Sequence, residues 1–375
     1  MAKFEPAIDG VIERAVEELQ KLEEAEVDLT TWMHIIAVEC LGACVLSWSP
    51  GMLKAGTDWN TMSHSYFAWR RKSVFGLFPP LTKLNLLFPV VGRVFSNLWG
   101  VTHRTPQNFK SFFPEVNKRI SRRIKAALRP IPANDRKDLL ADLIRLHRDK
   151  AEFNTSWLKK MAVTNFGAGH ETMASTLTAI VSMIGSYHKV QNQVAEEVRV
   201  RLKTASCSNA SAFSYVRATI KEVMRLNPVV AMSLPRETPA GGLEIHGQWI
   251  PPGTVVGCNP VALHRNTEIF GHDAEAFDPA RWLHADKVPD ALRTMNRYSL
   301  SWGGGSRSCP GRHLAEIVML KVIVRLVQRF DLAVEMPQES TQRAYFLSVP
   351  SGIRAHSSPP KLTRLNNSKI ASLFF

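Results

Sequence analysis

The fold of this chain is decided by the stretch Trp302-Gly303-Gly304-Gly305-Ser306-Arg307-Ser308-Cys309-Pro310-Gly311-Arg312-His313-Leu314-Ala315. Three successive glycines allow positive φ and let the backbone approach a flat ligand without Cβ clashes. Downstream of Cys309, residues recur at helical spacing, at Leu314, Ile317, Val318, Lys321, Val322 and Arg325. We therefore expect Cys309 at or just before a helix N-terminus, where the helix dipole stabilises a thiolate.

The same stretch resembles the cysteine-ligand loop of the cytochrome P450 family, whose pattern is an aromatic, two residues, Gly, one, Arg, one, Cys, one, Gly. Trp302, Gly305, Arg307, Cys309 and Gly311 fall on this pattern, with Trp where Phe is usual. A lone intracellular cysteine is otherwise most often a small buried hydrophobe. The resemblance implies haem b bound through the Cys309 thiolate, with Trp302, Gly305 and Gly311 among the cofactor-binding residues.

Two arginines match positions that contact haem propionates in this family. Arg307 lies inside the cysteine loop, and Arg236 lies in Leu234-Pro235-Arg236. The planar fork of arginine donates two parallel hydrogen bonds to a carboxylate. For Arg236 the alternative is an ordinary surface arginine.

A second motif interrupts a long apolar helix pattern with Phe166-Gly167-Ala168-Gly169-His170-Glu171-Thr172. Two helical glycines each cost about 1 kcal/mol relative to alanine. The resemblance identifies Ala168, Gly169, Glu171 and Thr172 with the oxygen-binding segment of the family's central helix. It implies that Thr172 hydrogen-bonds the bound oxygen or its water and that Glu171 relays protons toward it. The alternative is close helix packing at small residues, and His170 is interpreted as structural.

A third constellation consists of Glu222, Arg225 and Arg281. A helix is expected from about Phe213 to Leu226, so Glu222 and Arg225 are three apart on it and can pair. Such a pair also occurs on many surface helices. In the family, a Glu-Arg-Arg triad locks the cysteine loop onto the core, and the order Glu222, Arg225, Arg281, Cys309 is reproduced here. The implied role of this structural triad is not catalytic.

Composition indicates a globular protein in a reducing compartment. The chain has 375 residues, of which 45% are hydrophobic, and its five cysteines lack metal-type spacing. We expect no disulfide framework, and we place Cys40 and Cys44 on one buried helix face. No signal peptide or spanning segment is visible, because the most apolar window, Trp32 to Trp48, is interrupted by Glu39 and indicates a buried helix.

The net charge of +14 is scattered rather than concentrated in a recognised nucleic-acid-binding pattern. The densest run is expected to form a solvated helix face, at Lys118, Arg119, Arg122, Arg123 and Lys125. We therefore expect no nucleic-acid partner. A basic surface instead suits an acidic redox partner or an anionic membrane.

Helices come first along the chain and strands come late. The expected fold is mainly α with small β-sheets (α+β), as a single cytochrome P450 domain over residues 1–375. Its parts are a helix-rich region at 1–230, a β-hairpin region at 231–260, a meander with the cysteine loop at 261–311, and a proximal helix with closing strands at 312–375.

Several element boundaries are predicted more closely. One long helix is expected from Trp157 to about Tyr187, capped by Thr155 or Ser156. The closing strands are expected at Leu332 to Val334 and at Ala344 to Leu347.

The resemblance also predicts what this chain lacks. Members of the family begin earlier, with a membrane anchor, first sheet strands and a helix whose Trp and Arg hold a propionate. Trp69-Arg70-Arg71 does not match that Trp and Arg, which are four residues apart. The expected fold is therefore N-terminally truncated, with part of the haem edge facing water.

The predicted function is that of a haem-thiolate monooxygenase of the fungal microsomal type, which inserts one oxygen atom from O2 into an apolar small molecule in secondary metabolism. Electrons are expected from NADPH through cytochrome P450 reductase, docking near a basic face with Arg312, Lys321 and Arg325. The alternatives are a truncated, non-catalytic haem-binding remnant and a haem-thiolate isomerase or dehydratase. We expect a monomer at the endoplasmic reticulum membrane by resemblance, or a peripheral or cytosolic protein because no anchor is visible.

Overall fold

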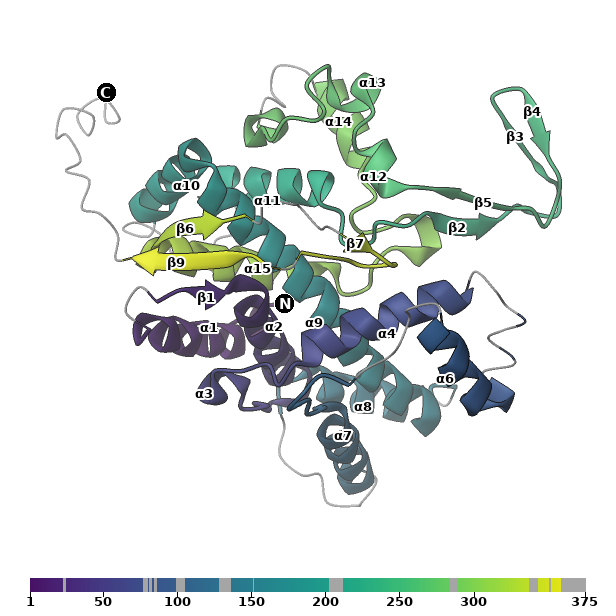
Figure 1. Cartoon of the computed structure of the whole chain (residues 1–375), viewed down its shortest axis with the longest axis horizontal. Helices are drawn as coiled ribbons and strands as arrows, with labels where there is room; N and C mark the ends of the chain where they lie inside the picture. The colour runs from purple at the N-terminus through teal and green to yellow at the C-terminus, as the bar shows by residue number, and fades with distance from the viewer. Residues whose placement is uncertain are drawn as a thin grey trace.

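The computed structural model describes residues 1–22, 25–76, 80, 83, 86–98, 105–127, 136–150, 152–201, 212–283, 289–336, 343–350 and 352–358. Within these ranges helices dominate and the strands form small antiparallel sheets, so the predicted fold class is confirmed (Figure 1). The connector predicted at 129–134 and Cys207 lie outside the described residues.

The principal helices are α1 (Glu5–Gln20), α2 (Leu29–Leu46), α3 (Met52–Ala55), α4 (Thr61–Gly76), α6 (Pro89–Leu98), α7 (Phe113–Ala127), α8 (Leu139–Asp149), α9 (Thr155–Ser186), α10 (His188–Arg201), α11 (Ser214–Leu226), α14 (Pro289–Tyr298) and α15 (Arg312–Arg329). Shorter turns connect them in the second half, at α12 (Pro260–Leu263), α13 (Thr267–Phe270) and the 3-10 turn η3 (Pro279–Trp282).

The centre of the molecule is the contact between α2 and α9, which cross in the middle of Figure 1. Helix α2 is buried over most of its length and α9 from Met173 onward, because their apolar residues there are not confined to one stripe. By length and composition α2 could cross a membrane, yet 89% of that window is buried in the fold. It is a core helix, as its sequence predicted.

The interruption that the sequence showed in α2, Glu39, has a structural role. Its side chain is buried, and its carboxylate accepts hydrogen bonds from the Ser49 hydroxyl at 2.6 Å and from the backbone N–H groups of Gly51 at 2.8 Å and Met52 at 2.7 Å. An anion at the start of α3 satisfies donors that have no partner inside that helix. Glu39 therefore fixes the turn between α2 and α3.

The predicted thiol pair of α2 is buried as expected. Cys40 and Cys44 are free and buried, and burial raises the pKa of Cys44 to about 12. Neither thiol is a nucleophile in this environment, since the thiolate is the reactive form.

Strands form one sheet beside α9 and separate hairpins. Strand β1 (Val27–Asp28) pairs antiparallel with β9 (Arg354–Ser358), which pairs with β6 (Asp331–Glu335). The hairpin region predicted between Leu234 and Val256 contains two antiparallel pairs. They are β2 (Leu234–Glu237) with β5 (Val255–Cys258) and β3 (Leu243–Ile245) with β4 (Gln248–Ile250). In Figure 1 the β3–β4 hairpin projects away from the body.

Two predicted boundaries are wrong. The cap of α9 is Asn154 rather than Thr155 or Ser156, because the Asn154 side chain accepts from the backbone N–H of Trp157 at 3.0 Å. The second closing strand, expected at Ala344–Leu347, falls on the turn between β7 (Arg343–Ala344) and β8 (Ser348–Val349). The third strand of the closing sheet is instead β9, which the sequence analysis did not anticipate.

Helix α1 covers α15 through ion pairs. Lys321 of α15 contacts Asp9 at 2.8 Å and Glu5 at 3.1 Å, and Arg325 contacts Glu13 at 2.6 Å. The three acids recur every four residues on α1 and so occupy one helix face.

Candidate functional site

The cysteine loop precedes α15, which begins at Arg312. The loop folds back on itself, since the backbone N–H of Cys309 donates to the carbonyl of Trp302 at 2.8 Å. Positive φ values of 70° at Gly303 and 60° at Gly305 permit this path, which side chains with a Cβ rarely adopt. The Cys309 thiol is free and exposed. The sequence thus placed Cys309 correctly, just before a helix N-terminus.

Open space borders the glycine run. A Cβ built on Gly304 or Gly305 would meet no heavy atom within 4 Å, and one on Gly311 would lie 3.8 Å from the Cys309 Sγ. Trp302 is partly buried and packs against the main core cluster. Trp302 therefore anchors the cysteine loop to the core, while the backbone at Gly304 and Gly305 faces open space.

The two predicted propionate ligands are both exposed. The Arg236 guanidinium, on β2, donates to the carbonyl of Gly304 at 3.5 Å, so it reaches the glycine run from a neighbouring strand. Arg307 ends the 3-10 turn Gly305–Arg307. In the described part of the chain, no ion pair holds either guanidinium. Both can receive a carboxylate.

Helix α9 continues through the glycine motif, so the segment is not a break in the helix. A Cβ on Gly169 would lie 3.0 Å from the Leu41 side chain of α2, whereas one on Gly167 would meet nothing within 4 Å. Close packing therefore explains Gly169 and leaves Gly167 without a packing reason. The hydroxyl of Thr172 donates to the carbonyl of Ala168 at 2.7 Å, which leaves its lone pairs free to accept.

The predicted acid Glu171 is held by an aromatic residue that the sequence did not single out. The indole N–H of Trp69, on α4, donates to Glu171 Oε2 at 2.7 Å. Trp69 stacks on Phe346 with ring centroids 4.9 Å apart, and Phe346 is 38% exposed. The partners lie 102 residues apart in the chain, and no local pattern marks such a contact.

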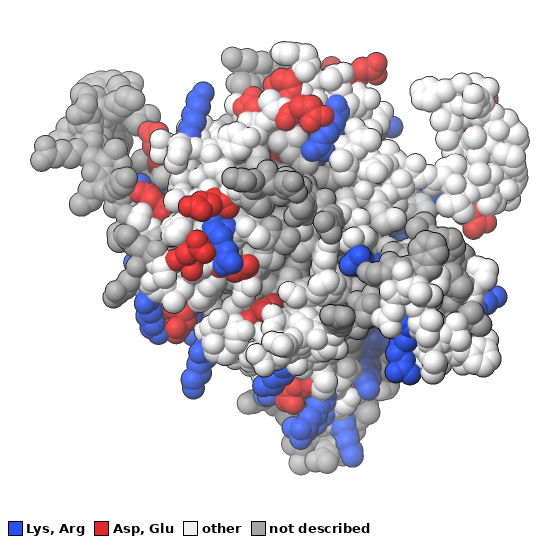
Figure 2. Space-filling view, in the orientation of Figure 1, with Lys and Arg blue, Asp and Glu red and all other residues white. Residues whose placement is uncertain are grey.

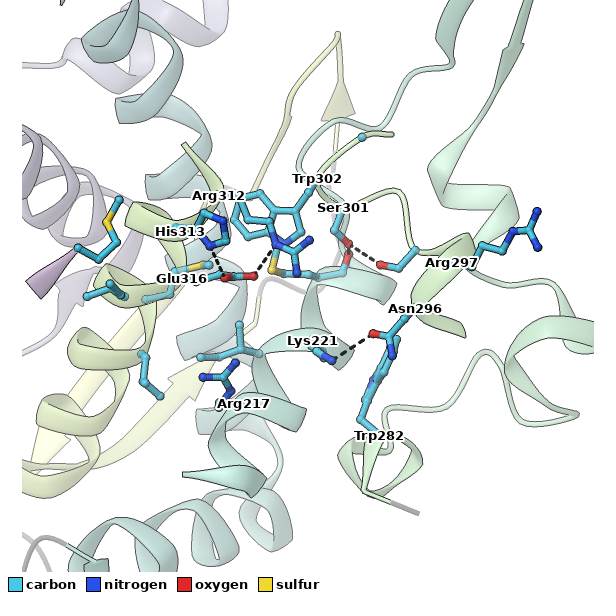
Figure 3. Close-up of a pocket in the computed structure, with 18 residues that line it drawn as sticks. Arg217, Lys221, Trp282, Asn296, Arg297, Ser301, Trp302, Arg312, His313 and Glu316 are labelled. Atoms are coloured by element: carbon cyan, nitrogen blue, oxygen red, sulfur yellow. Dashed lines mark hydrogen bonds and ion pairs between the residues drawn. The ribbon is translucent and has the colours of Figure 1, made fainter. Parts of the chain in front are cut away.

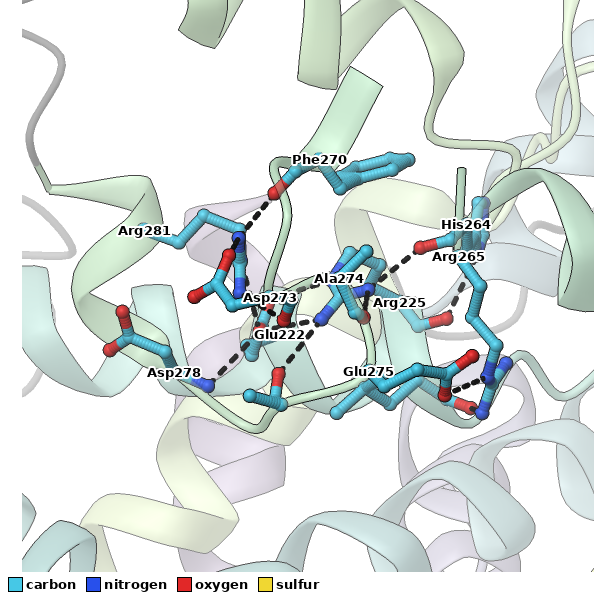
Figure 4. A network of polar contacts seen from close by, with 12 residues as sticks. Glu222, Arg225, His264, Arg265, Phe270, Asp273, Ala274, Glu275, Asp278 and Arg281 are labelled. Carbon is cyan, nitrogen blue, oxygen red and sulfur yellow. Dashed lines mark hydrogen bonds and ion pairs between the residues drawn. The ribbon is translucent and has the colours of Figure 1, made fainter. Parts of the chain in front are cut away.

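Glu222, Arg225 and Arg281 meet in the buried network of Figure 4. Glu222 and Arg225 are fully buried and form two hydrogen bonds of 2.8 Å, and the Arg281 Nε donates to Glu222 Oε1 at 3.3 Å. The Trp282 indole N–H also donates to Glu222, at 2.8 Å. Asp273 contacts Arg281 at 2.7 Å. The hydrogen bond from Arg281 is the main cause of the lowered pKa of Asp273. The buried charges are thus paired on every side.

His264 connects this network to the segment before the cysteine loop. Its Nδ1 lies 3.0 Å from the carbonyl of Arg225, and its Nε2 accepts from the backbone N–H of Leu300 at 2.8 Å. Burial lowers the pKa of His264 to about 4. The ring is therefore neutral, with its proton on Nδ1, and the triad positions the chain that leads into Trp302.

A cavity of about 350 Å³ lies beside the cysteine loop (Figure 3). Trp302 and Gly303 line it, together with residues of α11, α14 and α15. Four of the lining side chains are exposed cations, namely Arg217, Lys221, Arg297 and Arg312. Burial, followed by the charges of Arg217 and Arg312, lowers the pKa of Lys221. We call these four residues the basic rim.

The basic face predicted on α15 is wrong in part. Lys321 is 4% exposed, and although burial alone would lower its pKa, Asp9 and Glu5 raise it overall. Arg325 is paired with Glu13. The acids of α1 therefore neutralise two of the three cations. Arg312 is exposed, and its Nε donates to Glu316 of the same helix at 2.8 Å.

Elsewhere the positive charge is dispersed, as Figure 2 shows for one face, where acidic and basic side chains are interspersed. In the basic run of α7, Lys118, Arg122 and Lys125 are exposed as predicted. Arg119 instead pairs with Glu115, and Arg123 with the buried carboxylate of Asp138 at 2.6 Å.

These residues fit a haem. A free exposed thiol precedes a long helix, a run of glycines borders open space, and two exposed guanidinium groups, without an ion pair among the described residues, belong to or reach that loop. Along α9, Met161, Thr164 and Ala168 are exposed at helical spacing with Thr172 half-buried, so the helix leaves an open strip at the glycine motif.

The comparisons with known proteins agree with this geometry. A family model described as Cytochrome P450 matches residues 1–360. The chain is 50% identical to cytochrome P450 monooxygenase sdnT of Sordaria araneosa, over 95% of this chain and 69% of that protein. It is 28% identical to pisatin demethylase of Fusarium vanettenii, over 89% and 64%, and 27% identical to cytochrome P450 monooxygenase ACRTS1 of Alternaria alternata, over 92% of each.

The chain belongs to the cytochrome P450 family. The predicted family and enzyme class, a cytochrome P450 oxidoreductase, are thereby confirmed. The chain spans about two thirds of the length of sdnT and slightly less of pisatin demethylase.

Proposed function

We propose that this chain is a haem-thiolate monooxygenase that transfers one atom of O2 to an apolar small molecule in fungal secondary metabolism. The observation that carries the proposal is the free, exposed Cys309 thiol at the start of α15, inside a glycine loop flanked by Arg236 and Arg307. A haem bound there would supply the activation of O2, with a thiolate ligand that favours O–O cleavage.

Each predicted site residue then has a defined task. Cys309 would hold the iron of a bound haem as a thiolate, which the N-terminal end of α15 favours. Arg236 and Arg307 would bind its propionates, while Trp302, Gly305 and Gly311 shape the loop so that a flat ring can approach. The triad of Glu222, Arg225 and Arg281 keeps this loop in place.

The proton-delivering residues in this proposal are Glu171 and Thr172 of α9. Reducing one oxygen atom to water consumes two protons, and the half-buried carboxylate and hydroxyl are the protic groups of the α9 motif. The aromatic pair Trp69 and Phe346, next to Glu171, favours an apolar substrate. By family resemblance the protein acts at the endoplasmic reticulum membrane as a monomer.

The direct test is spectroscopic. The expressed chain is supplied with haem, reduced under carbon monoxide and examined in the Soret region. A strongly red-shifted band, typical of thiolate ligation, supports the proposal, whereas the absence of haem uptake would identify the chain as a non-catalytic remnant. A rearranged or dehydrated product that forms without external electrons and carries no oxygen from O2 would favour an isomerase or dehydratase.

Replacement of the proton-delivering residues tests the reaction. Glu171→Gln is expected to lower product formation about a hundredfold, the scale of one lost acid–base group. The reducing equivalents should instead appear as peroxide, with haem uptake unchanged. Product per NADPH is compared with that of Glu196→Gln, an exposed glutamate of α10. An unchanged yield would remove Glu171 from the mechanism.

The basic rim is the proposed docking surface for an NADPH-dependent cytochrome P450 reductase. Its cations crowd around a cavity beside the cysteine loop, and this crowding favours an acidic partner. The double variant Lys221→Glu, Arg297→Glu is expected to raise the half-saturating reductase concentration about tenfold and to leave the saturated rate unchanged.

The matched control for this surface is Lys189→Glu, an exposed lysine of α10. The difference between the variants should shrink as ionic strength rises, because exposed charges are screened. Equal effects of both variants would mean that the reductase docks elsewhere.

A further inference from the structure

Three buried ionisable side chains form a chain that ends at Glu171. The Nδ1 of His34, on α2, lies 3.1 Å from Asp58 Oδ2, and the Nε2 of His34 lies 3.1 Å from the Nδ1 of His170 on α9. The Nε2 of His170 is 3.9 Å from Glu171 Oε1. His34 is fully buried, His170 is 1% exposed and Asp58 is 5% exposed.

The outer end of this chain is a carboxylate. Burial alone would raise the pKa of Asp58, but the hydrogen bond and charge of His34, with the backbone N–H groups of Met62 and Asn60, lower it overall. Those N–H groups donate to Asp58 at 3.0 Å and 2.8 Å. Since an ionised carboxylate only accepts, the proton between Asp58 and His34 resides on His34 Nδ1.

The inner ring is neutral. Burial, followed by the charge of His34, holds the pKa of His170 well below its usual range. Phe112 and Phe113 contact the ring edge-on, with centroids 5.3 Å and 5.6 Å away. His170 therefore carries one proton, on either Nδ1 or Nε2, and its aromatic contacts fix the ring orientation.

One proton occupies the contact between the two rings, and its position decides the charges of His34 and Glu171. If His34 Nε2 carries it, His34 is an imidazolium and the proton of His170 is on Nε2, facing the Glu171 carboxylate. If His170 Nδ1 carries it, the Nε2 of His170 has no proton and can accept a hydrogen bond from a protonated Glu171. The two arrangements contain the same number of protons.

We propose that Asp58, His34 and His170 hold one proton in reserve for Glu171, an inference that rests on the proposed role of Glu171 in proton delivery. In the transfer, the Nε2–H bond of His34 breaks as Nδ1–H forms on His170, and the Nε2–H bond of His170 breaks as O–H forms on Glu171. The imidazolium and the carboxylate become neutral together. Solvent reprotonates Glu171, and the reverse shift refills His34.

The geometry supports such a reserve. Trp69 holds Oε2 of Glu171 at 2.7 Å, so that Oε1 is the oxygen near His170. The remaining gap of 3.9 Å must close by about 1 Å to form a hydrogen bond, and long contacts of this kind often tighten in the working complex. A carboxylate holds one proton, whereas forming water consumes two, so a second store beside Glu171 has a use. His34, His170 and Asp58 are thus positioning residues rather than catalytic ones.

The test that does not depend on turnover is nitrogen NMR of histidine rings labelled with 15N in the haem-loaded chain, in its diamagnetic ferrous carbonyl form. As pH rises, His34 is expected to lose its charge over the same interval in which the proton of His170 moves from Nε2 to Nδ1. Asp58→Asn should shift this joint transition down by about one pH unit, because a nearby opposite charge favours the protonated ring. Separate transitions, or an unshifted one, would overturn the proposal.

A kinetic test uses His34→Gln, with His188→Gln on α10 as an exposed control. His34→Gln should release about threefold more peroxide per NADPH and show a larger solvent isotope effect, less than the loss of a full acid–base group. The carbonyl spectrum should stay unchanged in both variants. If the wild-type chain binds no haem, the proposed function fails, and the same nitrogen spectra of the haem-free chain still decide whether the two rings titrate together. If the enzyme is active and both variants give equal peroxide yields, the proton-reserve proposal fails while the proposed function stands.

Discussion

Replacing Cys309 with serine is expected to abolish the red-shifted carbonyl band and to lower oxygenated product below detection. Cys309 is the residue proposed to hold the iron, and its thiol is free and exposed at the cysteine loop. A serine hydroxyl in its place stays protonated at neutral pH and binds iron weakly, so haem retention should fall as well. Spectra and haem content of the purified variant measure both effects.

The chain provides a matched control for this change. Cys258, on β5, is also free and exposed, but it is not in the cysteine loop. Cys258→Ser should keep the wild-type spectrum and turnover. If Cys309→Ser behaved like Cys258→Ser, the thiolate assignment would be wrong, and with it the whole proposed function.

Removal of the Glu222 carboxylate is expected to cost about 3–5 kcal/mol of unfolding free energy, since it leaves buried cations without a partner. Arg225 is fully buried and Arg281 is nearly so, and both donate to Glu222. Urea unfolding of Glu222→Ala followed by tryptophan fluorescence gives the loss. Glu222→Gln, which keeps the shape and two polar atoms, should lose less and remain measurable if Glu222→Ala does not fold.

An exposed ion pair serves as the comparison. Glu275 pairs with Arg265 at 3.0 Å, and its side chain is 77% exposed. Glu275→Ala should cost below about 1 kcal/mol, the usual worth of a surface pair. Similar losses at both positions would mean that Glu222 does not carry the stability of this region.

Local patterns in the sequence predicted the parts of the site that lie within one segment. The cysteine loop, the helix that follows it and the Glu222–Arg225 pair are each contained in a short window, where glycine conformations and helical spacing act directly. Arg281 was reachable only through the family resemblance. The cap of α9 was missed because Asn154, Thr155 and Ser156 are all good caps, and spacing does not choose among them.

What the sequence could not predict depends on contacts between distant segments. The local sequence predicts Lys321 as an exposed cation of α15. In the fold it is covered by α1, whose Asp9 lies more than three hundred residues away along the chain. His170 was interpreted as structural because it points elsewhere on the helix than the matched residues, and its partner His34 lies 136 residues earlier in the chain. His170 lies within the glycine motif of α9 but is not one of its matched positions, and only the tertiary fold brings Lys321 and His170 to their partners.

The acids along the inner face of α1 also have an electrostatic consequence for electron transfer. They cancel the charges of Lys321 and Arg325, so the attraction felt by the proposed anionic donor comes from the basic rim. If α1 moved away from α15, Lys321 and Arg325 would become uncovered, and the same donor would meet a broader and less selective field. Helix α1 can therefore influence where the proposed electron donor binds without contacting that donor.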